Sequence, residues 1–366
     1  MNKAFTLSRI KKLINLLNLS LIVSFCCLNL NLSAQQGREK RYVYLEGKWR
    51  FSIGDDKKWS RPDFDDHEWE EIKAPSAWEE QGFNGYDGYA WYRKHFYCPS
   101  NLSGKILYLH MGYIDDVDEV YVNGKLVGSS GEFPPYYNTA YTAYRRYPLP
   151  ESLLKINGDN VISVRVYDAQ MSGGIMSGEL GIYAVEFPVQ PDIVLEGYWK
   201  FHVDDNMQAK EKNFNDKDWN EIIVPGTWES QHYQNYDGFA WYRKKFTLPD
   251  NLKGKTLVLL LGKIDDKDET YLNGRLIGQT GNLHDEGTND YDWQRFRGYF
   301  IPADALQKDN VIAVRVYDGY IDGGIYEGPV GIMTQEKYNA YWKSRRDQQQ
   351  QNKKHQKNIW ELLFGS

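Results

Sequence analysis

Apolar and polar residues alternate over many short stretches of this chain, which is the period of a half-buried β-strand. WYRKHF (91–96) and ISVRVYD (162–168) alternate in this way, and ILYLHM (106–111) is a short apolar run. EVYVNGKLVG (119–128) places Asn-Gly between two such runs, which predicts a hairpin with a two-residue turn. Helical periodicity is almost absent before residue 335. The pattern predicts an all-β chain of antiparallel sheets.

The pattern occurs twice. DGYAWYRKHF (87–96) returns as DGFAWYRKKF (237–246), and the alignment extends through 41–183 and 191–333. A unit of this length is large enough to fold alone, which indicates two copies of one domain. The copies diverge most at 132–158 and 282–308, which predicts loops there. We therefore predict four parts: a signal peptide at 1–34, a first β-sandwich at 35–186, a second at 187–335 and a polar helical tail at 336–366.

The first 34 residues have the composition of a secretory signal. A basic start is followed by LINLLNLSLIVSFCCLNLNL and then by LSAQQ, with cleavage expected after Ala34. We expect export to the periplasm or cell surface. A lipid anchor on Cys26 or Cys27 is the alternative, although Phe25 is bulky for the preceding position. The four basic residues lost with the signal are Lys3, Arg9, Lys11 and Lys12.

Charge and cysteine content narrow the function classes. Removing those four positive charges changes the net charge from −6 to −10, which argues against nucleic acid and anionic membranes as partners. Cys98 is then the one remaining thiol, and we expect it to be a small buried hydrophobe. No apolar stretch after residue 34 is long enough for a transmembrane helix. The tail is Gln-rich and ends in IWELLF (359–364), an apolar end that docks on the body or on a partner, with a frayed tail as the alternative.

The order of motifs resembles a known family. Both copies contain G-x-W-x-F, P-x-x-W, D-G-x-A-W-Y-R-K, I-D-D-x-D-E-x-Y-x-N-G, N-V-I-x-V-R-V-Y-D and G-G-I-x-x-G. This resembles the galactose-binding-like jelly-roll domain, or sugar-binding domain, of family 2 glycoside hydrolases. The second copy is similar to the domain inserted in bacterial sialate O-acetylesterases. The resemblance implies two tandem jelly-roll β-sandwiches and a carbohydrate ligand.

The catalytic parts of those enzymes are not matched. Family 2 enzymes carry two catalytic glutamates on a separate (β/α)₈ barrel, and the two repeats leave no stretch of this sequence for one. Asn220-Glu221 has the letters of the acid/base motif but precedes a predicted strand. No histidine recurs at the equivalent position of the other copy, which argues against a catalytic triad or zinc site built into the domain.

The resemblance also implies where a sugar would bind. In the family, the loop before W-Y-R and the G-G-I loop lie at one end of the jelly roll. A carboxylate accepts paired hydroxyls, an aromatic ring stacks, and glycines allow close approach. The alternative is that both tryptophans are core residues and both aspartates cap turns. The candidate residues are Tyr86, Asp87, Gly88, Trp91, Gly173 and Gly174, with Tyr236, Asp237, Gly238, Trp241, Gly323 and Gly324 in the second copy.

Repeated carboxylates form a second candidate. Asp115, Asp116, Asp118 and Glu119 recur as 265, 266, 268 and 269. Arginines in apolar strands need anionic partners if they are buried, and we favour pairing of these acids with Arg93, Arg165, Arg243 and Arg315. A structural calcium site is the alternative, because calcium prefers oxygen ligands. Its candidate ligands are Asp115, Asp116, Asp265 and Asp266. We expect no other cofactor.

These observations predict an exported, non-catalytic carbohydrate-binding protein that acts alongside separate glycan-degrading proteins. Two alternatives remain. One is a glycoside hydrolase or esterase-associated hydrolase that uses carboxylates between the domains, Asp87 and Asp237 first. The other is a scaffold that binds proteins through the Tyr-rich segment 136–147 and the tail.

Overall fold

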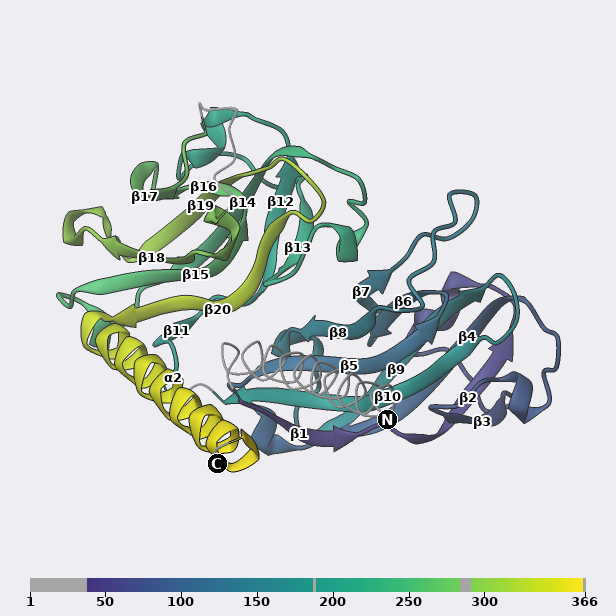
Figure 1. Ribbon diagram of the computed structural model, residues 1–366. Coiled ribbons are helices and arrows are strands. Elements are labelled where there is room, and N and C mark those ends of the chain that lie inside the picture. The colour runs from purple at the N-terminus through teal and green to yellow at the C-terminus, as the bar shows by residue number, and fades with distance from the viewer. Residues whose placement is uncertain (1–37, 187–188, 284–290, 365–366) are drawn as a thin grey trace, which may run out of the picture. The chain divides into compact units, whose positions relative to one another are not determined.

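The computed structural model describes residues 38–186, 189–283 and 291–364. In this part of the chain most of the regular structure is strand, arranged as four sheets (Figure 1). The first copy of the repeat forms one four-stranded and one six-stranded sheet, and the second copy forms an equivalent pair. The expected class, all-β with two tandem jelly-roll sandwiches, is confirmed. The predicted signal peptide lies outside the described residues, and the four domain boundaries stay predictions.

In the first sandwich the strand order is β1-β10-β5-β8 in one sheet and β3-β2-β4-β9-β6-β7 in the other. The paired strands of the six-stranded sheet are antiparallel. The strands are β1 (Arg38–Tyr44), β2 (Gly47–Ile53), β3 (Glu70–Ala74), β4 (Gly88–Cys98), β5 (Ile106–Asp115), β6 (Val117–Val122), β7 (Lys125–Ser130), β8 (Tyr144–Leu149), β9 (Gly158–Asp168) and β10 (Gly174–Glu186).

The second sandwich repeats this topology, with orders β11-β20-β15-β18 and β13-β12-β14-β19-β16-β17. Its strands are β11 (Ile193–Val194), β12 (Gly197–Val203), β13 (Asn220–Val224), β14 (Gly238–Thr247), β15 (Leu257–Asp265), β16 (Lys267–Leu272), β17 (Arg275–Thr280), β18 (Phe296–Ile301), β19 (Asp309–Asp318) and β20 (Gly324–Thr334).

The central strand β4 is buried on both of its faces. Ala90 and Tyr92 point into the apolar core between the two sheets, where Tyr92 packs edge-on against Trp49. Trp91 and Arg93 point to the other face, because successive side chains of a strand alternate, and both have no exposed surface. The segment before β3 covers this outer face. A strand buried on both faces explains why W-Y-R-K mixes apolar and charged residues.

The predicted Asn-Gly hairpins are confirmed. Asn123 and Gly124 join β6 to β7 with φ angles of 49° and 82°, the left-handed values that a two-residue turn requires. The Asn123 side chain donates to Leu153 O at 2.7 Å and accepts from Val161 N at 3.0 Å. Asn273 and Gly274 repeat these φ angles at 53° and 89°. The turn side chain therefore also anchors a neighbouring segment in each sandwich.

The loops predicted at 132–158 and 282–308 are a partial error, because each stretch contains a strand, β8 and β18 respectively. Arg145 on β8 and Arg297 on β18 are both fully buried and each pairs with an aspartate, Asp118 and Asp268. They occupy the same place in the fold although the sequence alignment does not put them opposite each other. Insertion and deletion around the strands hid the equivalence.

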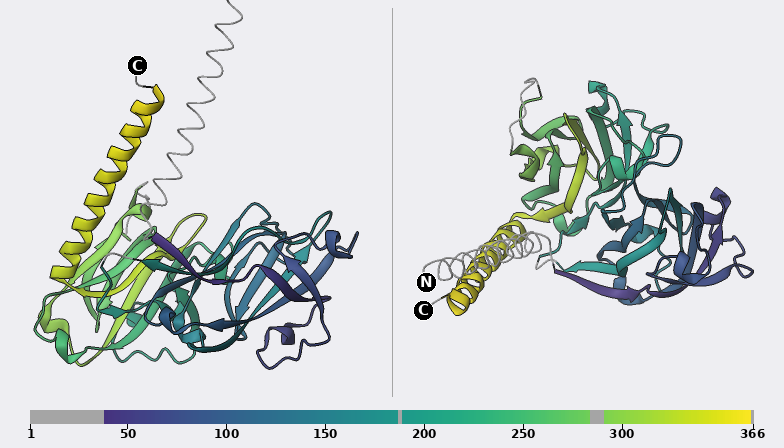
Figure 2. Two further views of the ribbon diagram at one scale, coloured as in Figure 1. Left: turned by 90° about the horizontal axis from the view of Figure 1, so that it is seen from below. Right: turned by 45° about the vertical axis from the view of Figure 1, so that its right-hand side comes forward.

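The tail forms helix α2 (Gln335–Phe364), a single continuous helix in Figure 2. The predicted helix is therefore confirmed, while the side chains of its apolar end, 359–364, lie outside the described part of the chain. Among the residues that the structure describes, no helix is long and apolar enough to cross a membrane. Cys98 is a buried free thiol, as expected.

Candidate ligand-binding site

Several strand ends meet at one end of each sandwich. In the first, the beginning of β4 pairs with the end of β9, with Gly88 opposite Asp168. In the second, Gly238 lies opposite Asp318 in the same way, and the end of β15 pairs with the beginning of β20. These ends bring together carboxylates that are distant in sequence. We call this region the acidic end: Asp87, Asp115, Asp116 and Asp168 in the first sandwich, and Asp237, Asp265, Asp266 and Asp318 in the second.

Three of the four carboxylates form a tight group in each acidic end. Asp115, Asp116 and Asp168 each place a carboxylate oxygen within 4.8 Å of the others, and Asp265, Asp266 and Asp318 do the same. Asp116 Oδ2 accepts from Ala169 N at 3.1 Å, which fixes it against the loop after β9. The peptide bonds Asp115–Asp116 and Asp265–Asp266 are cis.

The protonation of these groups is strongly perturbed. Burial, followed by the hydrogen bond and charge of Asp116, raises the pKa of Asp115 to about 7. Burial also raises the pKa of Asp168 to about 7, with the charges of Asp116 and Asp115 adding to the effect. In the second sandwich burial and the neighbouring carboxylates raise the pKa of Asp265 to about 8 and that of Asp318 to about 6. Such shifts are typical of sites that bind or react.

Asp87 and Asp237 are the exposed members of the acidic ends. The charge of Asp87 contributes to the raised pKa of Asp168, and the charge of Asp237 to that of Asp318, which places each exposed carboxylate near a buried one. Exposed apolar side chains follow in the loops after β9 and β19. Met171 is 81% exposed, and Tyr320 and Ile321 are 75% and 65% exposed. An accessible carboxylate at the same end of a sandwich as an exposed ring or aliphatic group is a combination that suits a sugar.

Tyr86 and Tyr236 have structural contacts at this end. The Tyr86 ring packs against Trp78 with centroids 5.8 Å apart, and its hydroxyl donates to Tyr89 O at 2.7 Å. Tyr236 makes the equivalent bond to Phe239 O at 2.7 Å. Both rings are half-buried. Their predicted role in ligand binding is untested, and the structure gives each a role in holding the loop before β4 or β14.

Trp91 and Trp241 lie on the outer face of their sheets and have no exposed surface. The Trp91 ring stacks on Tyr121 at 5.9 Å, and its Nε1 donates to Asp55 Oδ1 at 3.0 Å. Trp241 lies 5.9 Å from Tyr271, with the two rings tilted by 34°. Neither ring presents a face on which a ligand can stack. The structure therefore matches the alternative that both tryptophans are buried residues of a strand.

The glycines of the G-G-I loop allow close packing of the protein on itself. A Cβ added to Gly173 would lie 2.2 Å from Trp78, and one added to Gly323 would lie 2.2 Å from Trp228. Gly174 and Gly324 have φ angles of 113° and 112°, in the region that favours glycine. Gly88 and Gly238, with φ angles of 131° and 140°, begin β4 and β14. All six shape the acidic end, and a contact with ligand stays a prediction.

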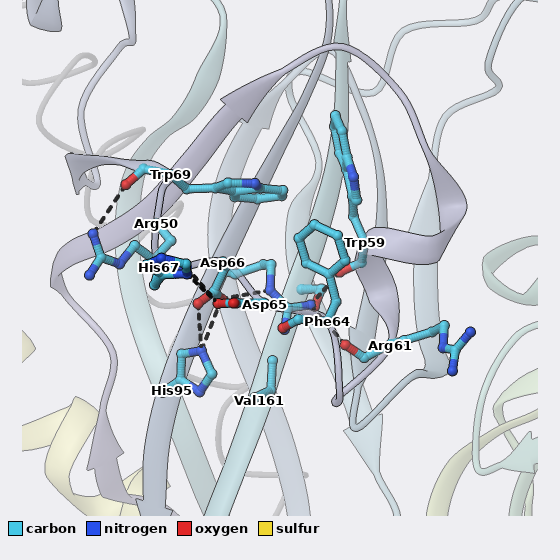
Figure 3. Close-up of polar contacts among 12 residues, drawn as sticks. Arg50, Trp59, Arg61, Phe64, Asp65, Asp66, His67, Trp69, His95 and Val161 are labelled. Atoms are coloured by element: carbon cyan, nitrogen blue, oxygen red, sulfur yellow. Dashed lines mark hydrogen bonds and ion pairs between the residues drawn. The ribbon is translucent and has the colours of Figure 1, made fainter.

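The buried arginines have acidic partners, as expected, but only some of these partners are the predicted ones. Arg165 Nη1 bonds Glu119 at 3.2 Å, and Arg315 repeats this bond with Glu269, so one acid of the repeated motif does pair with V-R-V-Y. Arg93 instead bonds Asp66 at 2.7 Å. Figure 3 shows Asp66 beside His95, with the rings of Trp59, Phe64 and Trp69 around them.

The second copy repeats the Asp66 arrangement with a different cation. Arg243 bonds Asp216 at 2.9 Å, and Lys245 takes the place of His95 at 3.1 Å from the same carboxylate. Pairing of Arg93 and Arg243 with the I-D-D-x-D-E motif is thus wrong, because the covering segment before β3 or β13 supplies the acid. Asp118 and Asp268 pair with Arg145 and Arg297 instead.

The sequence analysis did not single out four acids at or near the acidic ends, two in each sandwich. Asp168 and Asp318 end the V-R-V-Y-D motif, whose alternation predicts only a strand. Glu79 accepts from Gly173 N at 3.1 Å, and Glu229 repeats this contact with Gly323 N at 3.2 Å. The repeat itself was the available signal, because all four acids are identical in the two copies.

Comparison with known proteins finds similarity to a known domain family. Residues 54–172, which include its whole acidic end, match the family model of the β-galactosidase second all-beta domain. A beta-glucuronidase of Formosa agariphila is 29% identical over 131 residues, which cover 32% of this chain and 12% of that protein. A beta-galactosidase of Bacteroides ovatus is 28% identical over 130 residues, covering 32% of this chain and 14% of that protein. The resemblance to the sugar-binding domain of family 2 glycoside hydrolases is confirmed.

Among solved structures, a glycosyl hydrolase family 2 member from Bacteroides cellulosilyticus matches 76% of this chain and 31% of its own, at 15% identity and a TM-score of 0.34. The matched part of each curated relative is small, 12% and 14% of their lengths.

Proposed function

We propose that this is an exported, non-catalytic carbohydrate-binding protein that acts beside separate glycan-degrading enzymes. The observation that carries the proposal is the acidic end, which both sandwiches keep with identical carboxylates at equivalent positions. The match to a β-galactosidase all-beta domain and the similarity to a beta-glucuronidase and a beta-galactosidase support carbohydrate as the ligand class. The basic and then apolar start of the sequence supports export.

Asp87 and Asp237 are the residues that we expect to contact the sugar. Each is exposed and lies next to the buried carboxylates. An ionised carboxylate accepts hydrogen bonds from two adjacent hydroxyls, and hydrogen bonds to charged groups are the stronger ones. Exposed apolar side chains at Met171 and at Tyr320 and Ile321 supply surface for the apolar face of a sugar ring.

A glycan array tests the proposal. The purified protein is expected to bind one class of glycan selectively, and the double variant Asp87→Asn, Asp237→Asn to bind it about tenfold more weakly or worse. The matched control is Asp159→Asn with Asp309→Asn. These exposed aspartates lie at the opposite ends of the β4–β9 and β14–β19 strand pairs. A blank array, or equal loss in the control, would contradict the proposal.

The same variants separate binding from hydrolysis. Release of chromophore from aryl glycosides by the wild type, abolished by either Asp87→Asn or Asp237→Asn, would favour a hydrolase. Glycan binding without turnover supports the non-catalytic function. Binding that depends on 136–147 or on α2, with no glycan signal, would favour the protein-binding scaffold.

A further inference from the structure

In each acidic end, three carboxylates lie close together and are largely shielded from solvent. Asp168 and Asp318 have no exposed surface, and Asp116 is 6% exposed. Their carboxylate oxygens nevertheless lie within 4.8 Å of two others in each case. Like charges this close repel strongly where little water reaches them. The arrangement therefore requires a positive charge or bound protons.

One buried oxygen in each group has no hydrogen-bond partner among the described residues. Gln170 N donates to Asp168 Oδ1 at 3.3 Å, while Asp168 Oδ2 has no donor among the described residues. Asp318 Oδ2 likewise has no donor among them. Leaving a buried carboxylate oxygen without a partner is costly. Both free oxygens belong to the three-carboxylate groups, and the same atom is free in both copies. A chance failure of packing would not be expected twice.

A guanidinium reaches the backbone of each group, but it already has other partners. Arg145 donates to Asp118 Oδ1 at 2.7 Å and to the backbone oxygens of Ala140, Ala143 and Asp116. Arg297 repeats this with Asp268 Oδ1 at 3.0 Å and three backbone oxygens. These arginines donate to a backbone oxygen of the three-carboxylate group, but the carboxylate that they bond belongs to another aspartate. Among the described residues, Asp168 Oδ2 and Asp318 Oδ2 therefore remain available to another cation.

We propose that each acidic end binds one divalent cation of the calcium class, held by Asp115, Asp116 and Asp168 in the first sandwich and by Asp265, Asp266 and Asp318 in the second. Carboxylate oxygens are the ligands of a hard cation, and neither group contains the histidine or cysteine that zinc prefers. Asp115 and Asp265 are half-buried, which leaves solvent access for water ligands. The inference does not depend on sugar binding.

Calcium titration of chelator-treated protein tests this directly. Isothermal titration is expected to give two sites per chain for the wild type, one for Asp168→Asn or Asp318→Asn, and none for the double variant. Terbium provides a second readout. Trp78 flanks Gly173 together with Asp168, so it is close enough to sensitise terbium bound in the first sandwich. We expect calcium to displace that terbium and Asp168→Asn to remove most of its luminescence.

Thermal melting distinguishes a cation site from a structural role of the aspartates. Calcium is expected to raise the Tm of the wild type and to leave that of the double variant unchanged, because a ligand stabilises only the state that binds it. Without calcium the double variant should melt no lower than the wild type, since it removes repulsion. The control Asp159→Asn should bind two ions. Absence of calcium binding by the wild type, or two sites retained in the double variant, would overturn the proposal.

Discussion

At the scale of single residues, Arg93 holds the outer face of the first sandwich together. It is fully buried, bonds Asp66, and donates to the backbone oxygens of Trp59, Arg61 and Phe64. Removing one partner of a buried pair leaves the other charge without compensation, at a cost of about 3–5 kcal/mol. We expect Asp66→Ala to lower the free energy of unfolding by that amount in urea denaturation at pH 7. Asp63→Ala, which removes an exposed pair with Arg61, should lower the free energy of unfolding far less, because water screens an exposed pair.

The effect of Asp66→Ala should depend on pH in a defined direction. Burial alone would raise the pKa of Asp66, but the hydrogen bonds from Arg93 and His95 outweigh it and hold the pKa below its usual range. A carboxyl with a lowered folded pKa stabilises the protein above its unfolded pKa and loses that contribution as pH falls through the folded value. The difference in free energy of unfolding between wild type and Asp66→Ala should therefore decrease below about pH 3.9. A difference in free energy of unfolding that stays constant to low pH would contradict the ion pair as the cause of that difference.

The residue scale also marks the limit of sequence reasoning. An arginine in an apolar strand predicts an acidic partner, and each of the four predicted arginines has one. The identity of the partner depends on which segment covers the sheet. Asp66 lies on the loop before β3, and nothing local in the sequence places that loop over β4. The place of Asp168 in the three-carboxylate group was not predictable for the same reason, because the strand end that carries Asp115 and Asp116 meets Asp168 only in the fold.

Among elements, the β6–β7 hairpin is determined most locally. Comparing Gly124 in its turn with Gly104, which lies outside the hairpin, separates the cost of a left-handed backbone from the cost of a steric contact. Gly124 and Gly104 have similar φ angles, 82° and 73°, but an added Cβ meets Pro62 at 3.0 Å only at Gly124. Gly104→Ala should cost about 1 kcal/mol for the left-handed backbone. Gly124→Ala should cost about 1–3 kcal/mol more, because the neighbour must also move. Urea denaturation of both variants measures the difference, and equal costs would show that contact with Pro62 is unimportant.

Predictability differed between elements for physical reasons. Alternation and Asn-Gly turns are local signals, and β4, β6, β7 and β9 were predicted from them. Divergence of the two copies around strand β8 predicts a loop there, and Arg145 interrupts the apolar face that would have indicated a strand. That arginine is acceptable inside the sandwich only through Asp118, on a strand of the other sheet. Sheet order depends on contacts of this kind, so it became visible only in the structure.

For the whole molecule, duplication preserved the interior more strictly than the surface. The arginine–acid pairs, the hairpin side chain and the three-carboxylate group recur with the same geometry. The loop after β9 carries Gln170 and Met171, whereas the loop after β19 carries Tyr320 and Ile321. The two acidic ends therefore share their carboxylate group and differ in the exposed side chains of the following loop.

The presence of two proposed sites on one chain leads to a prediction about binding by the full chain. Two linked sites bind a polymer more tightly than a single site when both engage it, because the second binding event is intramolecular. The wild type is therefore expected to prefer a polysaccharide over its short oligosaccharide by at least tenfold. Asp87→Asn or Asp237→Asn alone should remove most of that preference while leaving one oligosaccharide site per chain, measured by isothermal titration. A preference that survives in both single variants would place polymer recognition within one sandwich, and the second copy would then need a different explanation.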